Sequence, residues 1–160
     1  MSYRIGLGTD FHQLVFGKKL WLGGIEIPHS KGSLGHSDAD VLLHAICDAM
    51  LGALNLGDIG IHFPDTDHSL KDIDSKILLK KTFQLIREKG FRIVNLDTVV
   101  CLEKPKIIAH TDGMRLIISE ILDVSPGDIS IKATTTEKLG FIGREEGIMA
   151  QAVVLLRKVD

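Results

Sequence analysis

The sequence is poor in the residues that mark several large classes of protein. It has only two cysteines, Cys47 and Cys101, and they do not form a CxxC pair. Two cysteines are too few for a disulfide scaffold, so we expect both to be small buried side chains in a reducing compartment. Tryptophan and tyrosine occur once each.

Excess charge and long apolar runs are also missing. Nineteen Lys and Arg against 21 Asp and Glu give a net charge of −2, so no broad positive surface predicts nucleic acid as the main partner. No apolar run approaches the roughly 20 residues that cross a bilayer. The segment Met1 to Ile5 shows no signal-peptide order. We therefore expect a soluble, cytoplasmic protein without a membrane partner.

The 160 residues, 44% of them hydrophobic, suit one domain over residues 1–160. The patterns predict strands at 3–7, 92–102, 129–134 and 148–159, a turn at 8–10, and a hairpin of 20–22 with 25–27. Helices are expected at 74–89, around 114–122, and from a cap at Ser37 or Asp38 to about residue 54; 29–35 and 57–69 are expected as loops. This order favours an α+β fold, with a mixed four-stranded sheet, helices on one face and a small β-hairpin.

Two of the predicted strands are apolar on both faces, at 99–102 and 152–156. Three helices cover only one face of a sheet, so the other face needs a different cover. We expect a second copy of the chain to provide it, which predicts a homo-oligomer.

Seven histidines are the chemical surplus of this sequence. Asp10 and His12 follow the first strand and point to one side of an extended chain; His44 lies on the first long helix. A carboxylate and two imidazoles form the ligand set of a catalytic zinc or similar ion with one open position. Asp40 and Asp48 flank His44 by one helical turn, so either is expected to hold its second ring nitrogen. Structural hydrogen bonding is the alternative for these residues.

Three further segments carry polar groups with two interpretations each. His36-Ser37-Asp38 at the start of that helix suits a phosphate oxygen, or a plain helix cap. The loop with Asp58 and Gly60 suits sugar hydroxyls, or turns. The threonines at 134–136 with Glu137 and Arg144 suit a phosphate and a magnesium-like ion; Thr134 and Glu137 also match a capping box.

Taken together, these segments resemble the 2-C-methyl-D-erythritol 2,4-cyclodiphosphate synthase family over essentially the whole chain. The resemblance is carried, in chain order, by Gly8 to His12, Gly35 to His44, Leu56 to Gly60, Phe63 to Asp67, Lys132 to Phe141 and Gly143-Arg144. Several separated motifs in the right order are far more specific than any one of them. Ala39 stands where glycine is common in the family, and Glu103-Lys104 stand where small or amide residues also occur.

The resemblance implies a homotrimer assembled around its sheets, with active sites between adjacent subunits. It implies zinc or another divalent metal at Asp10, His12 and His44, and Mg²⁺ or Mn²⁺ near Glu137 with the diphosphate. His36 and Thr135 match positions of transition-state stabilisation. The positions that match substrate contacts are Ser37, Asp58, Ile59, Gly60, Phe63, Pro64, Asp65, Thr66, Asp67, Thr134, Thr136, Phe141 and Arg144, with Glu103, Lys104, Pro105, Lys106, Ile107, Ile108 and Ala109 as the cytidine pocket.

The implied reaction converts 4-diphosphocytidyl-2-C-methyl-D-erythritol 2-phosphate to the 2,4-cyclodiphosphate and CMP, a phosphorus–oxygen lyase step of non-mevalonate isoprenoid biosynthesis. Two alternatives stay open from the residues. One is a zinc-dependent phosphodiester or diphosphate hydrolase that uses the same three ligands to activate water. The other is a non-catalytic trimer, stabilised by zinc, whose central cavity binds an isoprenoid.

Overall fold

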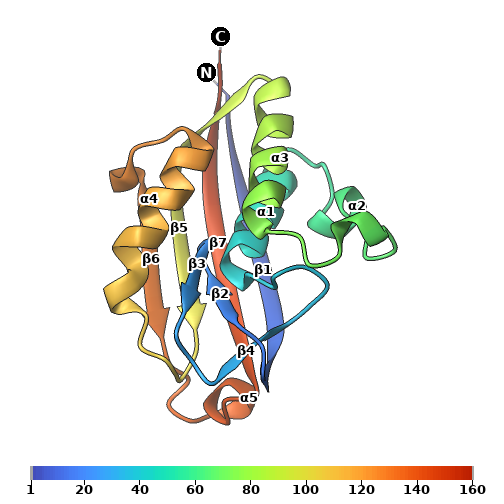
Figure 1. The fold of residues 1–160 in the computed structure, drawn as a ribbon. Helices are drawn as coiled ribbons and strands as arrows, with labels where there is room; N and C mark the ends of the chain where they lie inside the picture. Colours follow the sequence, from blue (N-terminus) through green and yellow to red (C-terminus); the bar gives the residue numbers. More distant parts are fainter. Residues whose placement is uncertain (1, 160) are drawn as a thin grey trace.

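The computed structural model describes residues 2–159, and its centre is a five-stranded sheet in the order β4-β1-β7-β5-β6 (Figure 1). Strand β5 pairs with β6 in parallel, and the other pairs are antiparallel. The strands of this sheet are β1 (Tyr3–Phe16), β4 (Lys31–Leu34), β5 (Phe91–Cys101), β6 (Ile129–Thr134) and β7 (Gly147–Lys158). The predicted hairpin is confirmed as β2 (Leu20–Leu22) and β3 (Ile25–Ile27).

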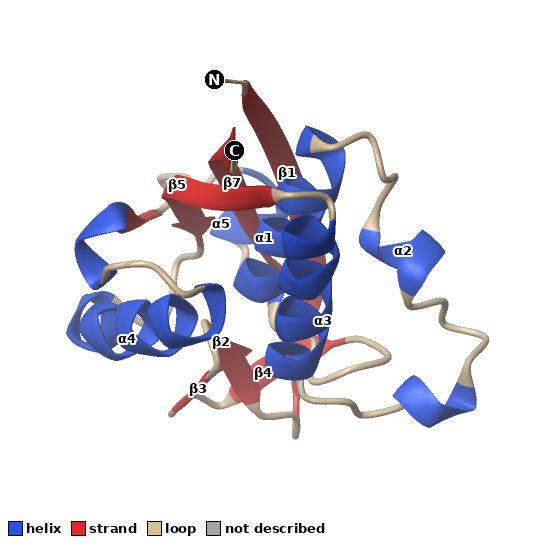
Figure 2. Cartoon of the chain, turned by 90° about the horizontal axis from the view of Figure 1, so that it is seen from above, coloured by secondary structure: helices blue, strands red, loops and turns tan. Residues whose placement is uncertain are grey.

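The three long helices lie on one side of this sheet (Figure 2), as the sequence predicts. Helix α1 packs against β1 and β7, α4 packs against β6, and α3 packs against both helices. The α-helices are α1 (Val41–Ala53), α2 (Ile59–His62), α3 (Ser75–Glu88), α4 (Thr111–Leu122) and α5 (Gly140–Gly143), and short 3-10 turns are η1 (His68–Leu70), η2 (Ile108–His110) and η3 (Pro126–Asp128).

The prediction of four strands is wrong by one strand, because Gly8 is interpreted as part of a turn that ends the first strand. The first strand was expected to end at Leu7 with a turn at 8–10, but β1 continues to Phe16. Its extension pairs with β4, in a segment expected to be a Gly/Ser loop. Gly8 is therefore a residue of the strand and not part of a turn.

The two glycines of β1 allow an unusually close approach of α1. A Cβ atom on Gly6 would lie 1.9 Å from the carbonyl oxygen of Ala49, and one on Gly8 would lie 2.0 Å from that of Ala45. Because no side chain intervenes, the helix backbone rests directly on the strand. This contact sets the distance between the residues that follow Gly8 on β1 and those on the first half of α1.

We expect Gly8→Ala to lower the free energy of unfolding by about 1–3 kcal/mol, because the added methyl group forces the strand and helix apart. Gly52→Ala is the matched control on α1, since the nearest atom to its Cβ would be 3.9 Å away. It should raise the free energy of unfolding by about 0.5–1 kcal/mol through higher helix propensity. Urea unfolding checks both values, and equal stability of Gly8→Ala and the wild type would contradict the prediction.

Helix α1 begins two or three residues later than predicted. The expected caps were Ser37 or Asp38, but Ala39 has a left-handed backbone (φ 56°) and Asp40 is the cap, accepting a hydrogen bond from the Leu43 N–H. The Asp40 carboxylate also accepts from the N–H groups of Gly23 and Gly24 at 3.0 and 2.7 Å. The hairpin is therefore tied to the start of the helix through one buried carboxylate.

The opposite face of the sheet is apolar over much of β1 and β7 and carries none of the three long helices. Ile5, Leu7 and Phe11 of β1 are 71%, 63% and 55% exposed, and Val153 of β7 stands beside Leu7. The expected second apolar face is thus present on β1 and β7 and is open to solvent in the single chain, whereas β5 and β6 carry Asp97 and Lys132 on that face. Among the described residues, no helix has the length and apolar character needed to span a membrane.

Candidate active site

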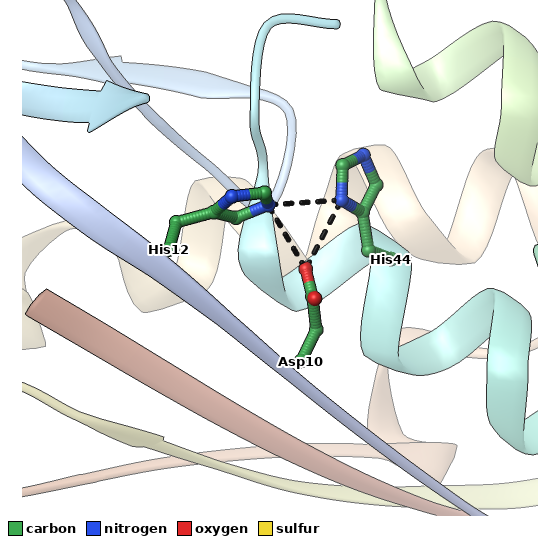
Figure 3. Close-up of side chains that lie close together, drawn as sticks. All are labelled: Asp10, His12 and His44. Carbon is green, nitrogen blue, oxygen red and sulfur yellow. Dashed lines mark hydrogen bonds and ion pairs between the residues drawn. The ribbon is translucent and has the colours of Figure 1, made fainter. Parts of the chain in front are cut away.

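Asp10, His12 and His44 meet where β1 passes under α1 (Figure 3). The Asp10 Oδ2 atom lies 3.0 Å from His12 Nε2 and 3.1 Å from His44 Nδ1, and the two histidine nitrogens are 3.2 Å apart. The alternating direction of side chains along β1 puts Asp10 and His12 on the helix face. The close contact at Gly8 brings the second turn of α1, with His44, to the same point.

The chemistry of this group fits a divalent metal ion. Its three ligand atoms, two imidazole nitrogens and one carboxylate oxygen, all lie within 4.8 Å of one another. His12 Nδ1 donates to the Leu34 carbonyl oxygen at 3.1 Å, which leaves the Nε2 lone pair facing Asp10 and His44. Three protein ligands with one open position are typical of a catalytic zinc site.

The charges of the group agree with this interpretation. Burial acts to raise the pKa of Asp10, but the adjacent imidazoles of His12 and His44 outweigh it and hold that pKa well below its usual range. Asp10 is therefore a carboxylate at neutral pH, the form that binds a metal.

The predicted partners of the second His44 nitrogen are wrong. Asp40 caps α1, and Asp48 accepts from the Ile59 N–H at 2.7 Å. His44 Nε2 instead lies 2.9 Å from Ser75 Oγ and 3.2 Å from Ser37 Oγ. The helical spacing of four residues places Asp40 and Asp48 along α1, whereas the Nε2 atom faces the first residue of α3, which no local pattern identifies.

A cavity of about 220 Å³ opens beside the three ligands. His12 and His44 line it together with His36 and Ser37 from the segment before α1. Four of the loop positions that match substrate contacts also line it: Ile59, Gly60, Phe63 and Asp65. Sequence reasoning missed three apolar lining residues, Leu70, Ile73 and Leu78, whose apolar character does not differ from that of core residues.

The other matched loop positions lie outside this lining. Asp58 caps α2 by accepting from the Ile61 N–H at 3.1 Å, and Asp67 caps η1 by accepting from the Ser69 N–H at 2.9 Å. Pro64 and Thr66 are exposed between them. These caps shape the loop that carries the lining residues.

A second cavity, of about 490 Å³, lies at β6. Four residues of the expected cytidine segment, Pro105 to Ile108, line it with Thr134 and Thr135. The remaining residues of that segment face elsewhere: Ala109 is exposed, Lys104 Nζ pairs with Glu145 at 3.0 Å, and Glu103 turns toward the threonines.

Glu103 organises the turn that follows β6. Its Oε1 atom accepts from the backbone N–H groups of Thr136 at 3.0 Å and Lys138 at 3.3 Å, and from the Thr136 hydroxyl at 3.2 Å. Thr135 Oγ1 donates to Glu137 Oε1 at 3.0 Å, and Glu137 has a left-handed backbone (φ 53°). No helix starts at this turn, so the capping box of Thr134 and Glu137 is not formed.

Two matched residues downstream of the turn have partners within the chain. Arg144 donates to both carboxylate oxygens of Glu146, at 3.0 and 2.9 Å. The Phe141 ring lies 6.1 Å from that of Phe11. Glu146 was not identified from the sequence, although an acid two residues from an arginine was a signal available there.

Within one chain the Glu137 turn and the metal ligands stand apart. Asp10 is level with Ala150 on β7, then Val100 on β5, then Ala133 on β6. Three strand spacings of about 4.8 Å put about 14 Å between Asp10 on β1 and Ala133 on β6. The Thr135 and Glu137 turn, which follows β6, is thus at the same end of the sheet as the three candidate ligands, and Thr135 lines the separate cavity.

Comparisons with known proteins agree on one family. The YgbB family model matches residues 3–157. The 2-C-methyl-D-erythritol 2,4-cyclodiphosphate synthase of Bacteroides fragilis is 60% identical over 159 residues, covering 99% of this chain and all of the relative.

Solved structures share the fold over nearly the whole chain. The bifunctional IspDF of Campylobacter jejuni has a TM-score of 0.95 and 42% identity, covering 99% of this chain, which spans 43% of that longer protein. The CDP complex of Plasmodium falciparum IspF has a TM-score of 0.88 and 36% identity, covering 99% of this chain and 98% of that one. The chain therefore belongs to the YgbB family of 2-C-methyl-D-erythritol 2,4-cyclodiphosphate synthases.

Proposed function

We propose that the protein converts 4-diphosphocytidyl-2-C-methyl-D-erythritol 2-phosphate to 2-C-methyl-D-erythritol 2,4-cyclodiphosphate and CMP. The observation that carries the proposal is the meeting of Asp10, His12 and His44 beside a cavity lined by His36, Ser37 and the 59–65 loop. Family membership over residues 3–157 supports the same reaction.

The chemistry is an intramolecular phosphoryl transfer. An oxygen of the 2-phosphate forms a bond to the β-phosphorus, the bond from that phosphorus to the bridging oxygen breaks, and CMP leaves with the electron pair. The attacking phosphate is already ionised near neutral pH, so no strong general base is needed. The difficulties are to hold two anions together and to exclude water.

Asp10, His12 and His44 would hold a zinc ion, and Glu137 would face Mg²⁺ or Mn²⁺ with the diphosphate. Bound divalent ions supply positive charge that reduces repulsion between phosphates and stabilises the transferred group. His36 lines the first cavity and would donate to a phosphate oxygen there, and Thr135, whose hydroxyl donates to Glu137, lines the second cavity. The Leu70, Ile73 and Leu78 side chains exclude water from one wall.

We propose in addition that the working unit is a homotrimer. Within one chain about 14 Å separates β1 from β6, and His12 and His44 line one cavity while Thr135 lines another. Packing of the exposed apolar face against other copies would cover Ile5, Leu7 and Phe11. The same packing would bring the Glu137 turn of one subunit to the metal ligands of the next.

Phosphorus NMR with the cytidyl substrate, with and without a chelator, tests the proposed reaction. A cyclic diphosphate and CMP, lost when the chelator is added, is the expected result. A linear phosphate would instead identify a hydrolase. No turnover together with chelator-induced loss of the oligomer would indicate a structural metal.

The carboxylate of Glu103 gives a separate test of the turn at 135–138. We expect Glu103→Ala to lower kcat about tenfold, because the backbone N–H groups of Thr136 and Lys138 lose their acceptor. Glu103→Gln is the matched control, since its amide oxygen can accept the same hydrogen bonds. Steady-state CMP release measures both variants, and an unchanged kcat in Glu103→Ala would show that this carboxylate does not order the turn.

Zinc affinity should fall as the pH is lowered. Burial acts to lower the pKa of His44, but the Asp10 carboxylate outweighs it and raises that pKa above 6.5. Protonated His44 has no lone pair at Nδ1, so affinity should fall about tenfold per pH unit below the raised pKa and level off above it. Asp10 stays ionised throughout this range. Chelator competition from pH 8 to pH 5.5 measures the profile, and a flat profile would contradict it.

A further inference from the structure

A chain of hydrogen bonds leads from His44 to a carboxylate outside the ligand group. His44 Nε2 lies 2.9 Å from Ser75 Oγ, and the Ser75 hydroxyl donates to Asp38 Oδ1. The Ser75 backbone N–H donates to the other oxygen of Asp38 at 3.0 Å. Ser75 is fully buried as the first residue of α3, and Asp38 lies in the segment before α1. Residues of α3 and of the segment before α1 therefore form one chain of hydrogen bonds that ends at the His44 imidazole.

The direction of these hydrogen bonds follows from the groups themselves. A carboxylate only accepts, so the single hydroxyl hydrogen of Ser75 is committed to Asp38. Ser75 Oγ can then only accept from His44, which requires the His44 proton to be on Nε2. The Nδ1 atom, which faces Asp10 and His12 at 3.1 and 3.2 Å, is left as the atom with a lone pair for a metal.

We propose that Ser75 and Asp38 form a positioning pair that orients the His44 ring and keeps its proton on Nε2, so that Nδ1 is available to the metal ion. The inference rests on the proposed metal centre and adds two residues to its support. Neither residue touches the ligand atoms of Asp10 or His12. Their effect on the metal ion passes through His44.

The other histidine shows why a carboxylate is needed behind the serine. His12 Nδ1 meets the Leu34 carbonyl oxygen, which can only accept, so that single contact fixes the position of its proton. A serine hydroxyl either donates or accepts, and alone it would not select a nitrogen of His44. Asp38 removes this ambiguity by accepting the Ser75 hydrogen.

The pair also links the metal ligand to the loop over the cavity. The Asp38 N–H donates to the Ile73 carbonyl oxygen at 3.1 Å, and the Asp72 N–H donates to that of His36 at 2.8 Å. Ile73 lines the cavity beside His44. Ser37 is a weaker contact of the imidazole, because its Oγ lies 3.2 Å from Nε2 and already accepts the Ala39 N–H.

Zinc affinity of single variants, measured by chelator competition, tests the pair without reference to catalysis. We expect Ser75→Ala and Asp38→Asn each to weaken zinc binding by about ten- to a hundredfold, the range found when a hydrogen-bond partner of a metal-bound histidine is removed. Ser119→Ala is the matched control: Ser119 is a buried helical serine whose hydroxyl donates to the Leu116 carbonyl oxygen. Its zinc affinity should equal that of the wild type.

Nitrogen-15 NMR of the zinc-loaded protein measures the exchange rate of the His44 Nε2 proton. This rate would not change if Ser75 and Asp38 only stabilised the fold. The wild type should show a slowly exchanging Nε2–H of His44, and Ser75→Ala should show faster exchange of that proton. Ser75→Ala with wild-type zinc affinity, or with wild-type exchange, would overturn the inference even if its thermal stability fell. Because these readouts do not involve turnover, they succeed or fail independently of the proposed cyclisation.

Discussion

His44→Ala should lower the rate of CMP release by about a thousandfold or more while leaving the fold intact. The substitution removes one of three candidate ligands of the metal centre, and charge stabilisation by such a centre contributes several kcal/mol to phosphoryl transfer. Alanine favours helix, and α1 keeps its other buried side chains, Leu42 and Ile46 among them. Far-UV circular dichroism should therefore match the wild type.

His29→Ala is the control for loss of a histidine as such. His29 stands between β3 and β4 and does not line the cavity at the metal ligands. Its turnover should equal that of the wild type. Near-normal CMP release by His44→Ala, or the same loss in both variants, would contradict the proposed metal centre.

The sequence predicts well which three candidate ligands come together, because two of them follow a local rule. Side chains two residues apart on a strand share a face, so Asp10 and His12 belong together whatever the rest of the fold does. That His44 joins them depends on the close packing of α1 on β1, which the bare backbone at Gly6 and Gly8 permits. Gly8 also accounts for the wrong expectation of a turn at 8–10. Its glycine is required by the close contact with Ala45 of α1, and not by a turn.

The hydrogen-bond partners of the candidate ligands could not be predicted from local sequence patterns, because they also lie in distant segments. The expected partners of His44 came from helical spacing, while the actual partner, Ser75, is 31 residues away and reaches it through the packing of α3 on α1. Likewise, the spacing of Thr134 and Glu137 matches a capping box, but the left-handed backbone at Glu137 and the carboxylate of Glu103 make it a turn. In both cases a contact between neighbouring residues of the chain was predicted, and the structure has a contact between distant segments instead.

Leu7→Glu should convert the proposed trimer to monomers and lower turnover by more than about a hundredfold. Leu7 is 63% exposed on the uncovered face of β1, next to Val153 of β7. In a single chain the new carboxylate would be hydrated, so folding should change little. In an assembly on this face it would be buried, at a cost of several kcal/mol for each subunit. In the proposed trimer, turnover depends on assembly because the Glu137 turn of one subunit would complete the site at the candidate ligands of the next.

Leu116→Glu is the matched control, because Leu116 of α4 is 54% exposed and belongs to the helical side of the sheet. It should leave both the oligomer and the turnover unchanged. Zinc affinity distinguishes loss of the metal site from loss of the assembly. Asp10, His12 and His44 come from one chain, so Leu7→Glu should still bind zinc as a monomer. Sedimentation velocity, chelator competition and CMP release on the same samples make the test. A monomeric Leu7→Glu variant with full turnover would show that one chain holds a complete active site, and the proposed sharing between subunits would be wrong.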